Sequence, residues 1–182
     1  NAARDNGIPV LVDPKSKDFS IYTGADLIKP NASELAAASG LPTASDSDVE
    51  TALGTLADSL PGTRLVVTRA GKGMSWYEGT KTFHMKGEAR QVFDVSGAGD
   101  TSMAALAAAI AAGAELKDAV ALAIAASGIV VGKVGTATVS VAELQRALSA
   151  GEAPQSAGLL PRTDAAELAT RCGVRGPGRR AG

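Results

Sequence analysis

A glycine-rich turn in the second half of the chain holds the residues best suited to catalysis. Residues 94–101 read Asp-Val-Ser-Gly-Ala-Gly-Asp-Thr and lead into a helical run of small side chains. Such a turn exposes backbone N–H groups and the positive end of the helix dipole, and together these bind phosphate. Asp100 can then accept the proton of an attacking hydroxyl during phosphoryl transfer. Taken alone, the pattern fits equally well a tight turn whose Asp100 only complements the dipole.

A second polar pair stands upstream, in the segment Lys-Pro-Asn-Ala-Ser-Glu of residues 29–34. Taken alone, the pair fits a structural role better, because Asn31 or Ser33 can cap the following helix while Glu34 complements its dipole. One carboxylate and one amide would also suffice chemically as protein ligands of Mg²⁺, which keeps several waters.

Two more loops follow predicted strands and could face a nucleotide. In the hexapeptide from Thr68 to Gly73, the candidate ligand contacts are Thr68, Gly71 and Gly73. The alternative is a strand-to-hairpin turn that needs glycine only for its conformation. An Asp-Pro-Lys sequence ends in Lys15 at the carboxyl end of the first predicted strand, where open α/β sheets bind ligands. Lys15 either reaches a phosphate from there or is a solvated loop lysine.

The elements needed to position these loops alternate along the chain. Short apolar β-rich runs alternate with segments of helical spacing, which predicts an α/β fold with a parallel sheet covered on both faces. Two runs around a Glu-Gly-Thr-Lys turn predict an antiparallel hairpin at the sheet edge. The predicted strands are 8–12, 25–29, 64–68, 74–77 and 82–85, and the main predicted helices are 32–39, 46–60, 100–112, 116–131 and 141–148.

The two ends of the chain differ in character. Residues 1–7 have the pattern of a helix tail that ends at a glycine, so we expect the chain to begin inside a domain. We expect residues 1–149 to form the globular part. Residues 150–182 lose all apolar periodicity and are rich in Gly and Arg, which is typical of a poorly ordered linker or tail.

Composition excludes several kinds of function. The chain has 182 residues, a net charge of −1 and only 3% aromatic residues, so we expect no nucleic-acid partner. Its longest apolar stretches, about 14 residues each, are shorter than the ~18 of a membrane span, so we expect no membrane partner. A single cysteine, Cys172, permits no internal disulfide and favours a cytoplasmic location. His84 is the only histidine, which excludes a histidine metal cluster.

Residues 94–101 resemble the signature of the ribokinase (PfkB) family of carbohydrate kinases, usually written D-T-x-G-A-G-D, with Val95 in place of the commonest Thr. The family's N-x-x-E and T-x-G-x-x-G patterns occur upstream in the family order, although the glycines of the second fall slightly differently here. The resemblance implies that Gly97, Ala98 and Gly99 form the anion hole and that Asp100 is the catalytic base. It also implies that Asn31, Ala32, Ser33 and Glu34 contact the nucleotide phosphates, with Asn31 and Glu34 near Mg²⁺.

The segment at the end of the predicted helix 116–131 and just after it is similar to the heptose 7-phosphate kinases of ADP-heptose synthesis, and the residues that carry the likeness are Val130, Gly132, Lys133 and Gly135 to Ser140. This likeness implies ATP-dependent phosphorylation of the C1 hydroxyl of D-glycero-D-manno-heptose 7-phosphate. Other members act on ribose, fructose phosphate or nucleosides, and an inactive nucleotide-binding fragment is the remaining alternative. In the wider family this region walls the adenine site, which implies contacts of the base with apolar residues from Ile129 to Val134. Ordinary core packing explains Ile129 and Val130 equally well.

The resemblance covers residues 1–148 and implies the second half of a three-layer, ribokinase-like α/β/α domain, with a mostly parallel sheet and an antiparallel edge hairpin. The implied ligands are ATP, Mg²⁺ and a phosphorylated sugar. A homodimer of the full-length protein and a fused nucleotidyltransferase domain after the tail both remain open.

Overall fold

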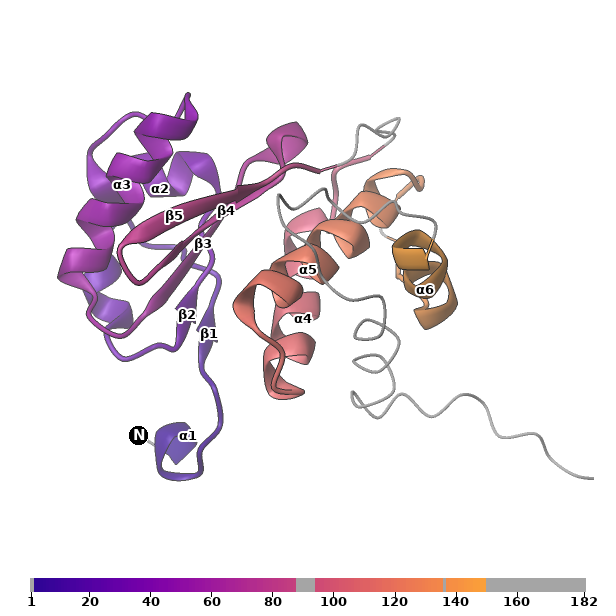
Figure 1. Cartoon of the computed structure of the whole chain (residues 1–182), viewed down its shortest axis with the longest axis horizontal. Coiled ribbons are helices and arrows are strands. Elements are labelled where there is room, and N and C mark those ends of the chain that lie inside the picture. The colour runs from indigo at the N-terminus through magenta and orange to yellow at the C-terminus, as the bar shows by residue number, and fades with distance from the viewer. Residues whose placement is uncertain (1, 88–93, 136, 150–182) are drawn as a thin grey trace, which may run out of the picture. The chain divides into compact units, whose positions relative to one another are not determined.

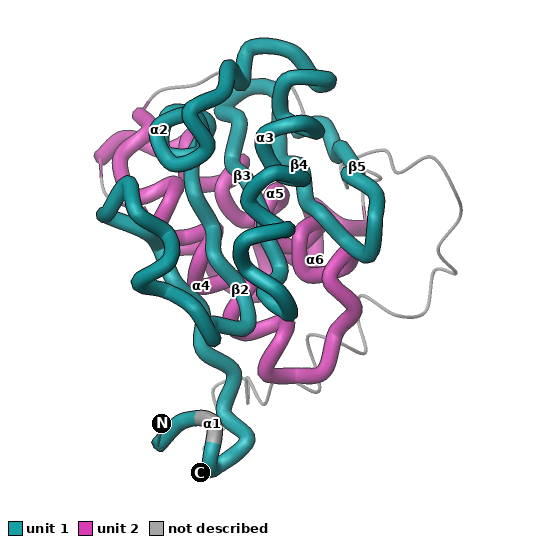
Figure 2. Tube along the Cα trace, turned by 90° about the vertical axis from the view of Figure 1, so that its left-hand side faces the viewer, with its two compact units in different colours: residues 1–89 teal, residues 90–182 magenta. Residues whose placement is uncertain are grey.

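The computed structural model describes residues 2–87, 94–135 and 137–149. The chain divides into an N-terminal unit, residues 1–89, and a C-terminal unit, residues 90–182 (Figure 2). The predicted tail at 150–182, with Cys172, lies outside the described residues.

The N-terminal unit is built on a five-stranded sheet whose strands lie in chain order (Figure 1). The first three strands are parallel, and the last two form an antiparallel hairpin at the edge, as the sequence predicts. The strands are β1 (Leu11–Val12), β2 (Leu27–Ile28), β3 (Arg64–Thr68), β4 (Met74–Glu78) and β5 (Lys81–Met85).

Strands β1 and β2 are shorter than the five residues predicted for each. Pro9 has no N–H to donate to a strand ladder. The next N–H, that of Val10, donates to the Asp26 carboxylate at 2.7 Å instead of to a backbone carbonyl. Val10 bonds to the neighbouring backbone only through its carbonyl, which accepts the N–H groups of Asp26 at 2.8 Å and Leu27 at 3.2 Å, and the paired residues of β1 begin at Leu11. Pro30 follows the end of β2 closely.

Two helices, α2 (Ala32–Ser39) and α3 (Asp46–Ser59), cover one face of this sheet (Figure 1). Each begins with a capping box, in which the N-cap side chain and the residue three positions later satisfy each other's backbone N–H. A four-residue α1 (Ala2–Asp5) and short 3₁₀ turns at Phe19–Tyr22 and Ala70–Lys72 complete the unit.

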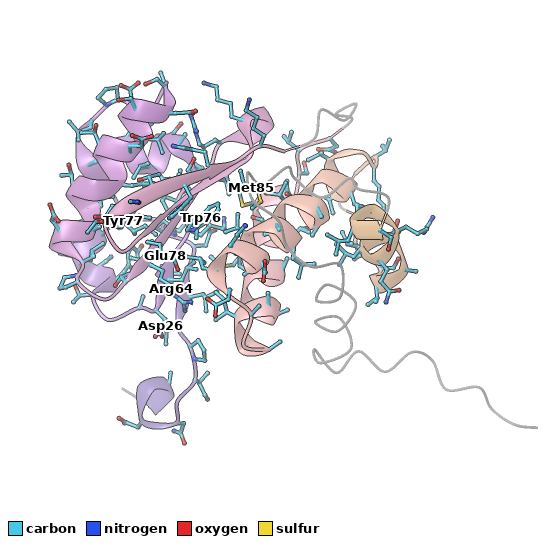
Figure 3. The ribbon with its side chains drawn as sticks, viewed as in Figure 1. Asp26, Arg64, Trp76, Tyr77, Glu78 and Met85 are labelled. Carbon is cyan, nitrogen blue, oxygen red and sulfur yellow. The ribbon has the colours of Figure 1, made fainter. Side chains whose placement is uncertain are left out.

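Successive side chains of each strand point to opposite faces of the sheet. Leu65 and Val67 of β3 join the buried cluster under α2 and α3, and Tyr77 of β4 packs against it. Figure 3 labels Tyr77 and its neighbour Trp76, which points to the opposite face. There Trp76 pairs with Val66 and stacks on Phe83, with ring centroids 5.3 Å apart. The cluster under the helices consists of Phe19, Ala25, Ile28, Leu35, Val49, Ala52, Leu53, Leu56, Leu60, Leu65 and Val67.

The described part of the C-terminal unit is helical, with α4 (Ala98–Ala111), α5 (Leu116–Val131) and α6 (Val141–Ser149). Helices α4 and α5 pack against each other, and α6 packs against α5. Gly113, with a φ of +81°, ends α4 in the left-handed conformation that glycine adopts most easily. Among the described residues, no helix is long and apolar enough to cross a bilayer.

Candidate active site

Gly97 is the N-cap of α4 and has a left-handed φ of +76°. The helix begins at Ala98, two residues earlier than predicted, because the carbonyl of Gly97 accepts the N–H of Thr101 at 2.8 Å. The N–H of Ala98 donates to Val95 O at 3.2 Å. Gly99 and Asp100 are the next two residues, and helix geometry leaves their N–H groups without an intrahelical acceptor.

The surroundings of this turn are open. A Cβ placed on Gly99 would meet no heavy atom within 4 Å. Both Gly99 and Asp100 are exposed, and Asp100 lies in the first turn of α4. Two donor amides and one carboxylate therefore face solvent together, an arrangement that can hold an anion beside a proton acceptor.

Asp94, which the sequence did not single out as a site residue, fixes the approach to the turn. Its Oδ1 accepts the N–H of Ser96 at 2.8 Å, and its own N–H donates to Val131 O at 3.3 Å. Hydrogen bonds from Ser96, and then from the backbone N–H of Gly135, hold the pKa of Asp94 below its usual value. Asp94 is therefore a charged anchor between the turn and the segment that follows α5.

In the segment after α5, the apolar residues differ in burial. Val130 is fully buried and Ile129 nearly so, in line with ordinary core packing. Val134, in contrast, is 86% exposed, so it is the apolar side chain of residues 129–134 most available to a ligand.

In the N-terminal unit, Asn31 and Glu34 form the capping box of α2. Asn31 Oδ1 accepts the N–H of Glu34 at 2.9 Å, and Glu34 Oε2 accepts the N–H of Asn31 at 2.8 Å. The pair thus caps α2, and the cap uses the only side-chain oxygen of Asn31 and one of the two carboxylate oxygens of Glu34. Among the described residues no hydrogen bond engages Glu34 Oε1, and it can serve as a metal ligand without loss of the cap.

The carboxyl ends of the parallel strands bring several predicted residues to one edge. Asn31 and Thr68 form an isolated parallel bridge, and the N–H of Thr68 donates to Pro30 O at 3.0 Å. Ala32 and Ser33 follow in the first turn of α2, and Ser33 is exposed. The predicted nucleotide contacts from the ends of β2 and β3 therefore lie together at this edge of the sheet.

Lys15 lies after β1, at the same end of the sheet. Its Nζ is 2.8 Å from Asp13 Oδ2, and its side chain is 78% exposed. Asp13 Oδ1 also binds Nζ of Lys29, a nearly buried lysine, at 3.1 Å. Partial burial by itself raises the pKa of Asp13, but the hydrogen bonds and charges of the two lysines lower it on balance. Asp13 and Lys29 were missed in the sequence, where the only signal is their place at strand ends.

The residues of the turn after β3 differ in their steric surroundings. A Cβ on Gly73 would lie 2.1 Å from Met85 O, and the φ of Gly73 is +84°, so this position requires glycine for steric reasons. Gly71 has open space around it. Ala70, at the position of the first glycine in T-x-G-x-x-G, keeps a positive φ of +49°.

Each unit therefore gathers its own set of predicted residues: Lys15, Asn31, Glu34 and Thr68 in one, and Gly97 to Asp100 in the other. Among the described residues no group of three or more His, Cys, Asp or Glu forms a metal cage. One or two oxygen ligands at Asn31 and Glu34 still fit Mg²⁺, which retains waters.

Two solved sugar kinases share the fold. Ribokinase from Arabidopsis thaliana, solved with ribose and ATP, aligns with a TM-score of 0.73 and 26% identity over 81% of this chain and 49% of that protein. Phosphofructokinase-2 from Escherichia coli aligns with a TM-score of 0.72 and 24% identity over 82% of this chain and 49% of that protein. The expected ribokinase-like fold is confirmed.

Curated relatives are closer in sequence. The bifunctional protein HldE of Hyphomonas neptunium is 52% identical over 160 residues, which are 87% of this chain and 33% of that protein. HldE of Pseudomonas fluorescens is 53% identical over 152 residues, 83% of this chain and 32% of that protein. The chain spans about a third of the length of these relatives. The family model described as pfkB family carbohydrate kinase matches residues 1–143, and the chain thus belongs to the pfkB family of carbohydrate kinases.

Proposed function

We propose that this chain supplies the nucleotide-binding and catalytic residues of an ATP-dependent kinase that phosphorylates the C1 hydroxyl of D-glycero-D-manno-heptose 7-phosphate. The observation that carries the proposal is the open turn at Gly97 to Gly99, which presents two free amides beside the exposed carboxylate of Asp100. The relatives at 52% and 53% identity are all HldE proteins, which favours heptose phosphate over ribose, fructose phosphate or a nucleoside as acceptor.

In this proposal, Asp100 accepts the proton of the sugar hydroxyl as that oxygen attacks the γ-phosphorus of ATP. The N–H groups of Gly99 and Asp100, together with the dipole of α4, stabilise the negative charge on the transferred group. Most of the rate comes from positioning and charge stabilisation.

Glu34 would hold Mg²⁺ through Oε1, the carboxylate oxygen not used in the cap, with Asn31 beside it, and Thr68 and Lys15 would contact the nucleotide from the edge of the sheet. Mg²⁺ neutralises charge on the phosphates when bound. Gly73 serves the turn itself, and Gly71 leaves room for the ligand to approach. This division of roles assigns the nucleotide to the loops after the parallel strands, the usual ligand position in such sheets.

We propose a cytoplasmic location, where ATP and phosphorylated sugars are available. The relatives are named bifunctional proteins, which favours a nucleotidyltransferase domain in the longer protein. A homodimer of that protein is a further proposal, which sedimentation would test directly.

Turnover of the full-length kinase tests the role of Asp100. Asp100→Asn should lower kcat about 10²- to 10⁴-fold, the range for a positioned general base. Glu115→Gln, an equivalent change at the exposed N-cap of α5, should leave kcat unchanged. Near-normal turnover of Asp100→Asn would refute the role. Parallel assays with ribose, fructose 6-phosphate and adenosine identify the acceptor, and a preference for any of these would overturn the heptose assignment.

Calorimetry on the 182-residue chain tests the nucleotide half separately. ATP·Mg²⁺ should bind more weakly to Glu34→Gln than to the unmodified chain, while Asp100→Asn retains the affinity. No binding by a folded chain would show that these residues do not form a nucleotide site on their own.

A further inference from the structure

Both carboxylate oxygens of Glu143, at the start of α6, are engaged. Oε2 accepts the N–H of Ser140 at 2.8 Å and its hydroxyl at 2.7 Å. Oε1 lies 2.7 Å from Nζ of Lys133, and the same ammonium donates to Thr138 O at 2.7 Å. Ser140 and Glu143 have the local spacing of a capping box, whereas the partner Lys133 lies at the other end of the loop.

The segment held by this pair is also attached to the catalytic turn. Val131 O, two residues before Lys133, accepts the N–H of Asp94 at 3.3 Å. Asp94 in turn accepts the N–H of Ser96, the residue before Gly97. An unbroken series of contacts therefore runs from α6 to the turn that begins α4.

We propose that Lys133 and Glu143 are positioning residues that hold residues 131–135 so that Asp94 fixes the turn of Gly97 and the orientation of Asp100. The role in turnover rests on the proposed function, whereas the structural link does not. Neither residue touches the reacting atoms.

Gly97 has no side chain with which to fix its own conformation, so the conformation of the turn depends on Asp94. Exposed ion pairs contribute little, but Lys133 and Glu143 are only 32% and 27% exposed and share their charges with three further hydrogen-bonding groups. Charge-assisted bonds of this length are the stronger kind. Small displacements of a catalytic group reduce the rate steeply.

Two variants separate this role from simple stabilisation of α6. Lys133→Met removes the ion pair and leaves the capping box intact. Ser140→Ala weakens the box and leaves the ion pair intact. Lys133→Arg restores a cation and serves as the rescue variant.

Amide hydrogen exchange, measured by NMR on the 182-residue chain without ligand, gives the first readout. Lys133→Met should raise the exchange rate of the Ser96 N–H about tenfold or more by local opening, and Lys133→Arg should restore slow exchange. Ser140→Ala should accelerate exchange only at the start of α6. Unchanged Ser96 exchange in Lys133→Met, or an equal rise in Ser140→Ala, would overturn the proposal.

The full-length kinase gives the second readout. Lys133→Met should lower kcat about tenfold, and Ser140→Ala should leave kcat unchanged. A fall in affinity with kcat unchanged would contradict positioning of Asp100. If Asp100→Asn proves active, the proposed function fails, but the exchange experiment still decides the structural link.

Discussion

Arg69 Nη1 lies 2.6 Å from Oδ1 of Asp46, the first residue of α3. The arginine side chain is 4% exposed and the aspartate side chain 63%. The same Nη1 lies 3.2 Å from Ser75 Oγ on β4 and 3.3 Å from His84 Nδ1 on β5. The hydrogen bond and charge of Arg69 lower the pKa of Asp46. The buried guanidinium of Arg69, the residue after Thr68, thus connects the end of β3 to α3 and to the edge hairpin.

Removal of this cation should destabilise the N-terminal unit. Arg69→Leu should lower the free energy of unfolding by about 1–2 kcal/mol, since it removes charge-assisted hydrogen bonds. The loss is moderated because Arg69 Nη2 is buried without a partner among the described residues. Urea unfolding measures the change, and Asp46→Asn, which alters only the exposed partner, should cost less. Equal stability of Arg69→Leu and the unmodified chain would show that Arg69 contributes nothing net.

The two glycines after β3 should respond very differently to alanine. Gly73→Ala should cost about 3 kcal/mol or more, because its Cβ would overlap the backbone around Met85 at a position that already has a positive φ. Gly71→Ala should change stability by no more than about 0.5 kcal/mol, since its Cβ meets open space. Thermal unfolding of both variants checks the pair. Similar effects would mean that the turn differs from the one described here.

The metal role of Glu34 can be separated from its cap. Gln at this position retains the capping box, so Glu34→Gln should keep α2 intact and weaken ATP·Mg²⁺ binding at least about tenfold, or 1.4 kcal/mol. Asp48→Asn makes the same kind of change in the capping box of α3. It should leave ATP·Mg²⁺ affinity unchanged in calorimetry. Equal affinities for both variants would identify Glu34 as a helix cap only.

Most elements of the fold could be predicted because their signals are local. The bounds of α2, β3 and α5 match the predicted ones, since cap residues and apolar periodicity mark their ends. The sequence also offered Asn31 as a cap of α2 but assigned Glu34 only to the helix dipole, whereas Glu34 completes a capping box. Strand β1 was predicted too long because its limit depends on the bond between Val10 and Asp26, residues far apart in the chain.

The same distinction holds for the candidate site. Its motifs could be found from spacing, and the structure shows the open turn before Asp100 and the bridge between Asn31 and Thr68. Arg69 and Lys133 were missed as organising residues, because their partners come from other elements of the fold. No local pattern predicts such contacts.

Lowering the pH should reduce the contribution of Glu143 to the stability of the folded chain within a defined pH range. The hydrogen bond from Lys133, followed by those from Ser140, lowers the pKa of Glu143 from 4.5 to about 2 in the folded chain. A carboxyl with a depressed folded pKa stabilises the fold fully above its unfolded pKa and loses this effect as pH falls through the folded value. The contribution of Glu143 is therefore present above pH 4.5 and decreases from there towards pH 2.

Urea midpoints of the unmodified chain and of Glu143→Gln, measured at pH 7, 5 and 3, test this range. The variant should be the less stable of the two at pH 7, and the difference should shrink at pH 3, because protonation gradually removes the same charge from the unmodified chain. Since Lys133 is the largest cause of the shift, Lys133→Met should reduce the acid dependence more than Ser140→Ala, which keeps the ion pair and the backbone bond. A difference between the unmodified chain and Glu143→Gln that stays constant from pH 7 to 3 would contradict the depressed pKa and the ion pair that produces it.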